Sequence, residues 1–194
     1  EAKQLELSKL GIEVVTAPSA NALRDLVASS EYVAPAPGIP ETHPVILEAL
    51  TQKKSVKTEL DIAYEWESQR IGGARPMLAV TGTDGKTTTV MMAEAILQSA
   101  GHSSIACGNT EVPLVEALDM EVDSFVVEAS SFRLAFIESF RAEASAWLNF
   151  DADHLDWHKS MKSYEQAKAR LWRNVVADDT AIGVSGENAV MRHM

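Results

Sequence analysis

The feature that most constrains this chain is a glycine-rich loop between a short apolar run and a helix-like segment. Residues 77–80 form an apolar run that is too short for a helix and is typical of a buried parallel strand. Residues 87–100 carry apolar side chains at helical spacing, and Gly101 follows as a stop. The chain between them reads Thr81-Gly-Thr-Asp-Gly-Lys-Thr-Thr-Thr89. A strand, a glycine-rich loop and a helix in this order predict a phosphate-binding site.

The residue types in the loop suit a triphosphate. Its two glycines allow a tight turn that brings backbone N–H groups close to an anion. Lys86 can neutralise the β- and γ-phosphate oxygens, and the Thr87 hydroxyl can bind Mg²⁺. The expected nucleotide contacts are Gly82, Thr83, Asp84, Gly85, Lys86, Thr87, Thr88 and Thr89. The usual Walker pattern has a glycine at the position of Val80, so a helix-capping turn with a solvated lysine is the alternative.

Strand-like and helix-like segments alternate along nearly the whole chain. The expected strands are residues 12–15, 32–33, 55–57, 77–80, 124–127, 144–148 and 181–184. The expected helices are residues 1–10, 20–28, 43–52, 59–69, 87–100 and 163–176. This alternation favours an α/β fold with a mostly parallel sheet. Two glycines and a proline in 72–76 predict a linker between residues 1–72 and residues 77–194.

Composition excludes several classes of protein. Lys and Arg number 17 against 28 Asp and Glu, a net charge of −11, which argues against binding to nucleic acid or an anionic membrane. The single cysteine, Cys107, cannot form an internal disulfide. No apolar run of membrane-spanning length and no signal peptide is evident, so we expect a soluble cytoplasmic protein. The chain opens without Met and ends without a stop signal, so we expect a piece of a longer protein.

Carboxylates follow two of the expected strands. Glu128 directly follows the run at 124–127, which places it at the carboxyl edge of a parallel sheet, where Mg²⁺ bound to nucleotide phosphates needs an anionic ligand. The alternative is a strand-end glutamate that faces water. The loop 149–158 contains three aspartates and two histidines, among them His154, and suits metal or phosphate chemistry. A solvated turn is the alternative there.

Three further polar residues have two interpretations each. Lys168 lies inside the expected helix 163–176, where the residues alone favour an exposed lysine paired with Glu165 over a functional group. Asn109 and Ser130 either cap turns or contact a ligand. The residue types alone do not decide between turn capping and ligand contact for Asn109 and Ser130.

Together, these segments resemble the Mur ligases, the ATP-dependent amino-acid-adding enzymes of peptidoglycan synthesis. The matching strings are Ala34-Pro-Ala-Pro-Gly-Ile39, Thr81-Gly-Thr-Asp-Gly-Lys-Thr87, Gly108-Asn109, Val127-Glu-Ala-Ser-Ser-Phe132, Leu148-Asn149, Asp153-His-Leu-Asp-Trp-His158 and Ala167-Lys-Ala-Arg170. Their order and spacing agree over nearly the whole chain. Phe132 after the serine pair and the Pro-Gly-Ile turn favour the members that add D-glutamate. The alternatives are a Mur ligase of other specificity, a folylpolyglutamate synthase, or a nucleotide-binding module without catalysis.

The resemblance implies a fold and an activity. Residues 1–72 would be an incomplete Rossmann-like domain for a UDP-sugar, and residues 77–194 the front part of a P-loop-type ATP-binding domain. ATP would phosphorylate the carboxylate of UDP-N-acetylmuramoyl-L-alanine, and the amine of D-glutamate would attack the acyl phosphate. The resemblance further implies ATP, two Mg²⁺ ions with Mn²⁺ as an alternative, and a monomeric whole protein. The present residues alone would be inactive.

The resemblance also implies a role for particular residues. Lys86, His154 and Lys168 would be catalytic, with Lys86 stabilising the transferring phosphoryl group. Thr87 and Glu128 would hold one metal ion, and His154 and Lys168 would help to hold a second. Lys168 matches a lysine that these enzymes carbamylate with CO₂, which replaces an ammonium by an anionic oxygen ligand.

On the substrate side, the resemblance assigns contacts with the UDP-linked sugar to Gly38, Asn109 and Ser130. Two positions depart from the family pattern: Asp84, where the family usually has Asn, and Arg133, where the D-glutamate-adding members usually have Gln. Asp84 adds a negative charge beside the phosphates, which opposes tight binding of ATP.

Overall fold

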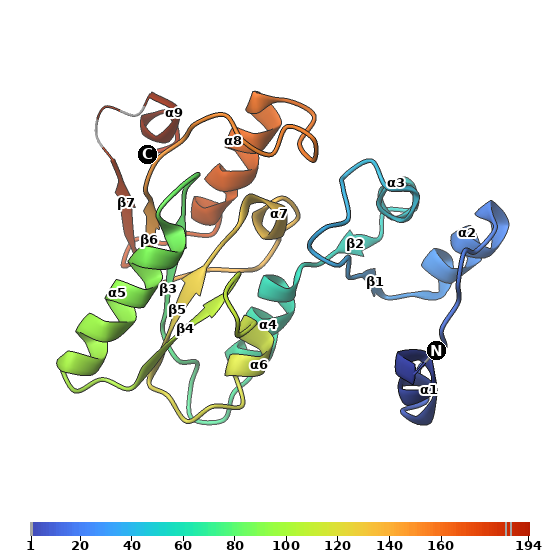
Figure 1. The fold of residues 1–194 in the computed structure, drawn as a ribbon, viewed down its shortest axis with the longest axis horizontal. Coiled ribbons are helices and arrows are strands. Elements are labelled where there is room, and N and C mark those ends of the chain that lie inside the picture. Colours follow the sequence, from blue (N-terminus) through green and yellow to red (C-terminus); the bar gives the residue numbers. More distant parts are fainter. Residues whose placement is uncertain (1, 185, 187) are drawn as a thin grey trace.

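The chain forms a small N-terminal unit and a larger unit built on a parallel sheet, as Figure 1 shows. The computed structural model describes residues 2–184, 186 and 188–194. Glu1, the first residue of the predicted helix 1–10, lies outside the described residues.

The N-terminal unit contains a two-stranded parallel sheet with two helices packed on it. Its elements are α1 (Ala2–Lys9), α2 (Ala20–Ser29), β1 (Tyr32–Val33), α3 (Pro44–Thr51) and β2 (Ser55–Val56). The side-chain oxygen of Ser19 accepts a hydrogen bond from the Ala22 N–H and caps the start of α2. A small core of Val27, Ile46, Ala49 and Val56 joins α2 and α3 to β2.

The predicted strand at residues 12–15 is wrong. These residues have no regular secondary structure and their side chains are exposed. Apolar residues form a strand only where a neighbouring strand can pair with their backbone. Within the described residues, the sheet of the N-terminal unit contains β1 and β2 alone.

The larger unit confirms the predicted α/β fold with parallel strands. Its elements are α4 (Glu59–Ser68), β3 (Met77–Thr81), α5 (Lys86–Ser99), β4 (Ser104–Gly108), α6 (Leu114–Ala117), β5 (Ser124–Glu128), α7 (Ser131–Leu134), β6 (Ala144–Trp147), α8 (Met161–Ala169), the 3₁₀ turn η1 (Arg170–Trp172), β7 (Thr180–Gly183) and α9 (Asn188–Met191). All strand pairs are parallel, and the strand order is β4-β5-β3-β6-β7.

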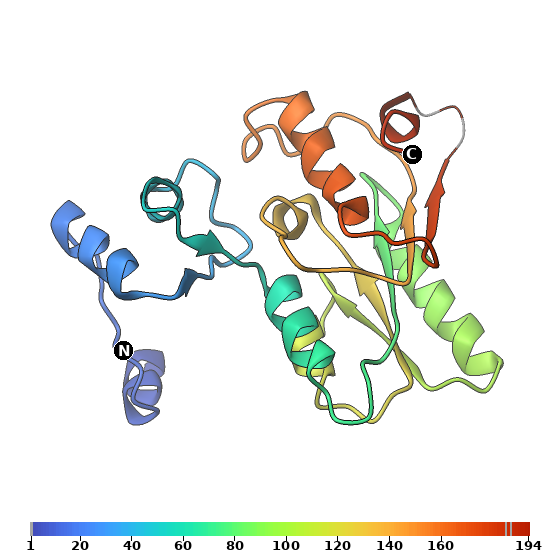
Figure 2. The ribbon, with the colours of Figure 1, turned by 180° about the vertical axis from the view of Figure 1, so that it is seen from behind.

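Helices cover both faces of this sheet, as the two opposite views in Figures 1 and 2 show. On the face covered by α5, Val80 of β3 packs with Val90 of α5 and Val126 of β5. On the opposite face, Met77 and Ala79 of β3 join the large core beneath α4, α6 and α7. Successive side chains of β3 therefore enter different cores, as expected for a strand buried on both faces.

Helix α4 packs with the larger unit although it precedes the expected linker at 72–76. Its Leu60 and Ala63 are fully buried in the core that contains Met77 and Phe125. Burial of these two apolar side chains fixes α4 to the sheet of the larger unit. The chain therefore passes from the core of the N-terminal unit to the core of the larger unit between β2 and α4. The division into two domains, with the boundaries expected from the sequence, stays a proposal.

The predicted helix at 163–176 is shorter than expected. It begins at Met161, where Ser160 and Ser163 form a reciprocal capping box, and ends at Ala169 before the 3₁₀ turn η1. Within the described residues, no helix combines the length and the apolar character needed to cross a bilayer.

Candidate nucleotide and substrate site

The glycine-rich loop lies at the carboxyl edge of the sheet, at the end of its central strand. It connects β3 to α5, and β3 lies between β5, which ends at Glu128, and β6, which leads into Asn149. Ligands of open parallel sheets bind outside this edge, because strand ends and helix N-termini converge there. The residues 82–89 expected to contact the nucleotide all lie in this loop and in the first turn of α5.

Two glycines allow close backbone turns at this edge. Gly85, the N-cap of α5, has a φ of 80°, a conformation that favours glycine. Gly108 at the end of β4 has a φ of +94°, and a Cβ atom there would lie 2.6 Å from the Glu128 carbonyl oxygen. The absence of a side chain at Gly108 therefore lets β4 approach the end of β5.

Lys86 folds back over its own loop. Its Nζ donates hydrogen bonds to the carbonyl oxygens of Gly82, at 3.0 Å, and of Thr83, at 2.7 Å. Both acceptors are uncharged carbonyl oxygens. A bound triphosphate would offer Lys86 stronger, charged acceptors at the N-terminus of α5.

Thr87 and Glu128 form the centre of the site. The Thr87 hydroxyl donates to Glu128 Oε2 at 2.7 Å, and Asn109 Nδ2 donates to Glu128 Oε1 at 3.1 Å. Glu128 is only 2% exposed. A buried carboxylate next to a hydroxyl offers the hard oxygen ligands that Mg²⁺ uses together with nucleotide phosphates and water. The pair therefore fits one Mg²⁺ ion, although no group of three His, Cys, Asp or Glu side chains gathers as a metal site within the described residues.

Asn149 holds the loop through its side chain, a contact that the sequence analysis did not predict although it quoted the Leu148-Asn149 string. Its Oδ1 accepts hydrogen bonds from the N–H groups of Thr83, at 2.8 Å, and Asp84, at 2.9 Å, and its Nδ2 donates to the Asp84 carbonyl oxygen. Asn149 thus fixes the first half of the phosphate loop. Its position two residues after the end of β6 was the available signal, since β6 pairs with β3.

Lys168 is buried against the phosphate loop. Its side chain is 1% exposed, and its Nζ donates to the Gly82 carbonyl oxygen at 2.6 Å, the same oxygen that accepts from Lys86. Burial, and next the nearby charge of Lys86, lower the pKa of Lys168 to about 7. The alternative of an exposed helix lysine is therefore wrong.

Tyr164 joins Lys168 to the loop and was also missed. The Lys168 Nζ lies 4.6 Å from the centre of the Tyr164 ring, and the Tyr164 hydroxyl lies 3.3 Å from Thr83 Oγ1. Tyr164 precedes Lys168 by one helical turn of α8, so the two side chains share a face. Burial raises the pKa of Tyr164, which keeps its hydroxyl protonated.

His154 lies at the same edge of the sheet, in the loop after β6. Its φ of 53° is unusual for a residue with a side chain, and such conformations cluster at functional sites. The imidazole ring lies 4.7 Å from the Phe132 ring and 6.0 Å from the Tyr164 ring, centre to centre. Lys168 and His154 thus flank the same tyrosine.

His158 connects the loop after β6 to the segment after β5. Its Nε2 lies 2.9 Å from the Ser131 hydroxyl oxygen, and both side chains are buried. Burial, and next the charges of His154 and Lys168, lower the pKa of His158 to about 4, so the imidazole is neutral. This bond keeps the two loops together.

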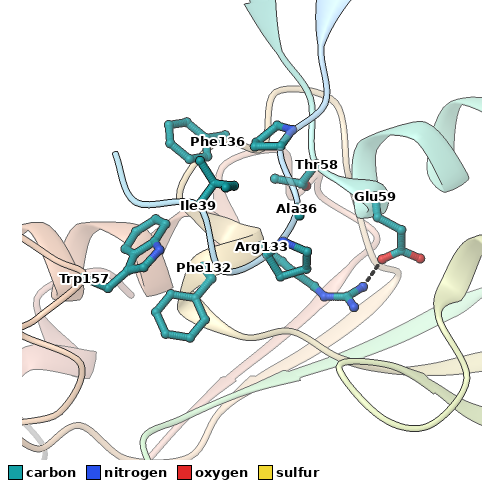
Figure 3. Close-up of a pocket in the computed structure, with 10 residues that line it drawn as sticks. Ala36, Ile39, Thr58, Glu59, Phe132, Arg133, Phe136 and Trp157 are labelled. Atoms are coloured by element: carbon teal, nitrogen blue, oxygen red, sulfur yellow. Dashed lines mark hydrogen bonds and ion pairs between the residues drawn. The ribbon is translucent and has the colours of Figure 1, made fainter. Parts of the chain in front are cut away.

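A narrow cavity opens between the N-terminal unit and α7, as Figure 3 shows. Pro37 and Ile39, which flank Gly38, line one side, and Phe132 and Arg133 of α7 line another. Arg133 forms an ion pair with Glu59 of α4, drawn as a dashed line in Figure 3. The cavity measures about 30 Å³, which is room for one or two water molecules.

Several polar atoms around this cavity lack protein partners within the described residues. They are Thr58 Oγ1, Arg133 Nε and Trp157 Nε1, and all three side chains are at least nine-tenths buried. The nearby Ser130 Oγ is also buried without a partner among the described residues. Buried polar groups are normally hydrogen-bonded, so these atoms point to water or to an acceptor group of a ligand.

Comparison with known proteins identifies the family. The sequence model of the Mur ligase middle domain matches residues 80–193. The chain belongs to the Mur ligase family. This Mur ligase chain is similar to the UDP-N-acetylmuramoylalanine–D-glutamate ligase of Mycolicibacterium vanbaalenii, with 42% identity over 79% of the chain and 32% of the relative. It is likewise 41% identical to the ligase of that name from Nocardia farcinica, over 85% of the chain and 35% of the relative.

Solved structures share the fold of this Mur ligase chain. The UDP-N-acetylmuramate:L-alanyl-γ-D-glutamyl-meso-diaminopimelate ligase of Neisseria meningitides superimposes with a TM-score of 0.54 at 18% identity, over 97% of this chain and 62% of that one. The MurF ligase of Thermotoga maritima, solved with ADP, gives a TM-score of 0.55 at 17% identity, over 76% and 40%. At these identities the likeness concerns the fold alone.

Proposed function

We propose that the whole protein is an ATP-dependent ligase that adds D-glutamate to UDP-N-acetylmuramoyl-L-alanine. The observation that carries the proposal is the contact of Thr87 with the buried Glu128, next to Lys86 at the start of α5. The names of the curated relatives support the choice of substrates. The chain spans about one third of the length of these relatives, so the activity concerns the whole protein.

The phosphate loop would bind the triphosphate of ATP. Among the described residues, the N–H groups of Lys86, Thr87 and Thr88 at the start of α5 have no helical acceptors of their own and are available to phosphate oxygens. The Thr89 N–H already donates to the Gly85 carbonyl oxygen at 2.9 Å. Lys86 would exchange the carbonyl oxygens of Gly82 and Thr83 for phosphate oxygens. Thr83 and Asp84 would stay fixed by Asn149, which pre-organises the loop.

Thr87 and Glu128 would hold a Mg²⁺ ion, for which Mn²⁺ could substitute. When bound, this ion would neutralise charge on the nucleotide phosphates. His154 and a carbamylated Lys168 would hold a second ion. The amine of Lys168 is buried between the Tyr164 ring and the Gly82 carbonyl oxygen, and this burial supports the modification. A carbamate would replace a buried ammonium by an anionic oxygen ligand for the metal ion.

Gly38, Asn109 and Ser130 would contact the UDP-linked sugar. Asn109 already donates a hydrogen bond to Glu128. Ser130 lies two positions after Glu128, and its buried hydroxyl has no partner in the part of the chain that the structure describes. Arg133 forms an ion pair with Glu59 and lies at the cavity of Figure 3. It would place a cation there, where the D-glutamate-adding ligases usually have a glutamine. We further expect the whole protein to be a monomer, which analytical ultracentrifugation would test.

The residues then have distinct tasks in the reaction. Lys86 would stabilise the charge on the phosphoryl group as it passes from ATP to the alanine carboxylate of the substrate. The amine of D-glutamate would then attack the acyl carbon, and phosphate would leave as the amide bond forms. Phosphoryl transfer requires accurate positioning of the reacting groups. The contacts of Lys86 and Lys168 with the Gly82 carbonyl oxygen would help to fix the loop for this purpose.

The proposal is tested by phosphate release from the whole protein with ATP. Release is expected only when both UDP-N-acetylmuramoyl-L-alanine and D-glutamate are present. Release that is unaffected by omission of D-glutamate would refute the assignment. Replacement of D-glutamate by other amino acids, or of the nucleotide sugar by a folate, tests the alternative specificities in the same assay.

Lys86→Ala is expected to abolish turnover in the whole protein. The change removes the cation that balances the transferring phosphoryl group, while the Cβ and the helix start remain. Circular dichroism should show an unchanged fold. Lys162→Ala, an exposed lysine on α8, is the matched control and should turn over as wild type does. An unchanged rate in Lys86→Ala would contradict its role as phosphate ligand.

A further inference from the structure

A second cavity lies where the N-terminal unit meets the larger unit. It measures about 350 Å³, within the range of small-molecule sites. Leu50 and Val56 line it from the N-terminal unit, and Ala135 and Phe136 line it from the segment after α7. Phe136 also packs against the small core of the N-terminal unit and lines the cavity of Figure 3. The second cavity thus borders the substrate side of the proposed site but does not include the phosphate loop.

Basic side chains gather at this cavity. Lys54, Lys159, Arg170 and Arg173 line it. None of these four forms an ion pair with a carboxylate of the part of the chain that the structure describes. This arrangement is unexpected in a chain with 28 acidic and only 17 basic residues.

The two arginines are held in place by backbone carbonyls. The Arg170 guanidinium donates to the Ala135 carbonyl oxygen, and the Arg173 guanidinium donates to the Ile137 carbonyl oxygen at 3.1 Å. Each guanidinium has five N–H donors, so both keep donors for a ligand. Arg170 and Arg173 are three residues apart and therefore lie on one side of the helical turn. Burial, and next the charge of Arg173, lower the pKa of Arg170, although the carboxylates of Glu41 and Glu138 act in the opposite direction.

The charged and apolar side chains that line this cavity indicate which kind of ligand it could bind. Two carboxylates, Glu41 and Glu138, also line the cavity, which leaves an excess of two positive charges from the four basic side chains. Glu138 Oε2 already accepts a hydrogen bond from the Ser55 hydroxyl. An excess of two positive charges matches the dianion of a phosphate monoester, and the apolar lining suits a hydrocarbon body.

We propose that this junction cavity binds an organic phosphate monoester with an apolar body, at a site distinct from the phosphate loop. The phosphoryl group lies between Arg170, Arg173 and Lys159, and the apolar body lies against Leu50 and Phe136. Because the walls come from both units, the bound ligand connects the N-terminal unit to the larger one.

The test uses phenyl phosphate as the probe, titrated by calorimetry into the full-length protein. Binding is expected for phenyl phosphate and not for phenol, which lacks the dianion. Arg173→Gln and Lys159→Gln should each weaken binding about tenfold, since each removes one charged donor. Arg192→Gln is the matched control, because Arg192 is an exposed arginine paired with Glu165 away from this cavity.

Lys86→Ala separates this proposal from the proposed function. Binding that persists in Lys86→Ala and falls in Arg173→Gln and Lys159→Gln supports the junction site, whether or not the ligase assay succeeds. Three results would overturn it: no binding of phenyl phosphate to the wild type, equal binding of phenol, or loss of binding in Lys86→Ala with full binding in the two junction variants. The last result would place the phosphate in the glycine-rich loop.

Discussion

Replacement of Asp61 tests how α4 is fixed to the larger unit. Asp61 is fully buried, and its carboxylate accepts hydrogen bonds from the N–H groups of Glu138, Ser139 and Phe140 at 2.9 to 3.1 Å. It also accepts from the Ser139 hydroxyl at 3.1 Å. One carboxylate thus satisfies three successive backbone donors in the segment after α7.

The expected loss for Asp61→Ala follows from these bonds. The buried Phe140 N–H would lose its charged acceptor, worth about 1.5–3 kcal/mol, and the two more accessible donors would lose about 1 kcal/mol each. The free energy of unfolding should fall by about 3–5 kcal/mol, a large part of the roughly 5–15 kcal/mol typical of a domain. At about 2–4 °C per kcal/mol, the melting temperature should fall by roughly 6–20 °C.

Urea unfolding followed by tryptophan fluorescence measures this change, because Trp147 is buried in the larger unit. Asp61→Asn keeps one carbonyl acceptor and should lose only about 1–2 kcal/mol. Asp25→Ala, an exposed aspartate on α2, is the control and should stay within about 0.5 kcal/mol of wild type. If Asp61→Ala matched the control, the proposed role of the carboxylate would be wrong.

Three further changes probe the site itself. Gly108→Ala should lower the melting temperature, since its Cβ would meet the Glu128 carbonyl at 2.6 Å in a left-handed backbone; a wild-type melting curve would contradict this. Thr87→Val should reduce turnover at least tenfold by removing the hydroxyl that bonds to Glu128, whereas Thr87→Ser should retain activity; steady-state kinetics at varied Mg²⁺ would compare them. Burial raises the pKa of Cys107 to about 12, so iodoacetamide at pH 8 should label this thiol only after unfolding, as mass spectrometry would show.

The sequence predicted most of the sheet because buried parallel strands are short, uninterrupted apolar runs. The segments at 77–80 and 124–127 correspond to β3 and β5, each within one residue of its observed end. The strand β4 was missed because Ser104–Gly108 contains only three apolar residues between polar and glycine ends. The helices α6 and α7 have four residues each, which is too few for helical periodicity to appear.

The geometry of the site depended on contacts that no local pattern contains. The residues alone favoured an exposed Lys168, because its burial depends on contact with Gly82, 86 positions earlier in the chain. The role of Asn149 depends in the same way on the pairing of β6 with β3. Polar residues at strand ends could be placed at the correct edge, but their hydrogen-bond partners required the three-dimensional structure.

The shared carbonyl oxygen of Gly82 ties two lysines from distant parts of the chain to a single acceptor. A ligand that draws Lys86 out of this arrangement changes the electrostatic surroundings of Lys168 at the same moment. Occupancy of the loop and the chemical modification of Lys168 on α8 are consequently linked, and a change at one of the two lysines affects the other.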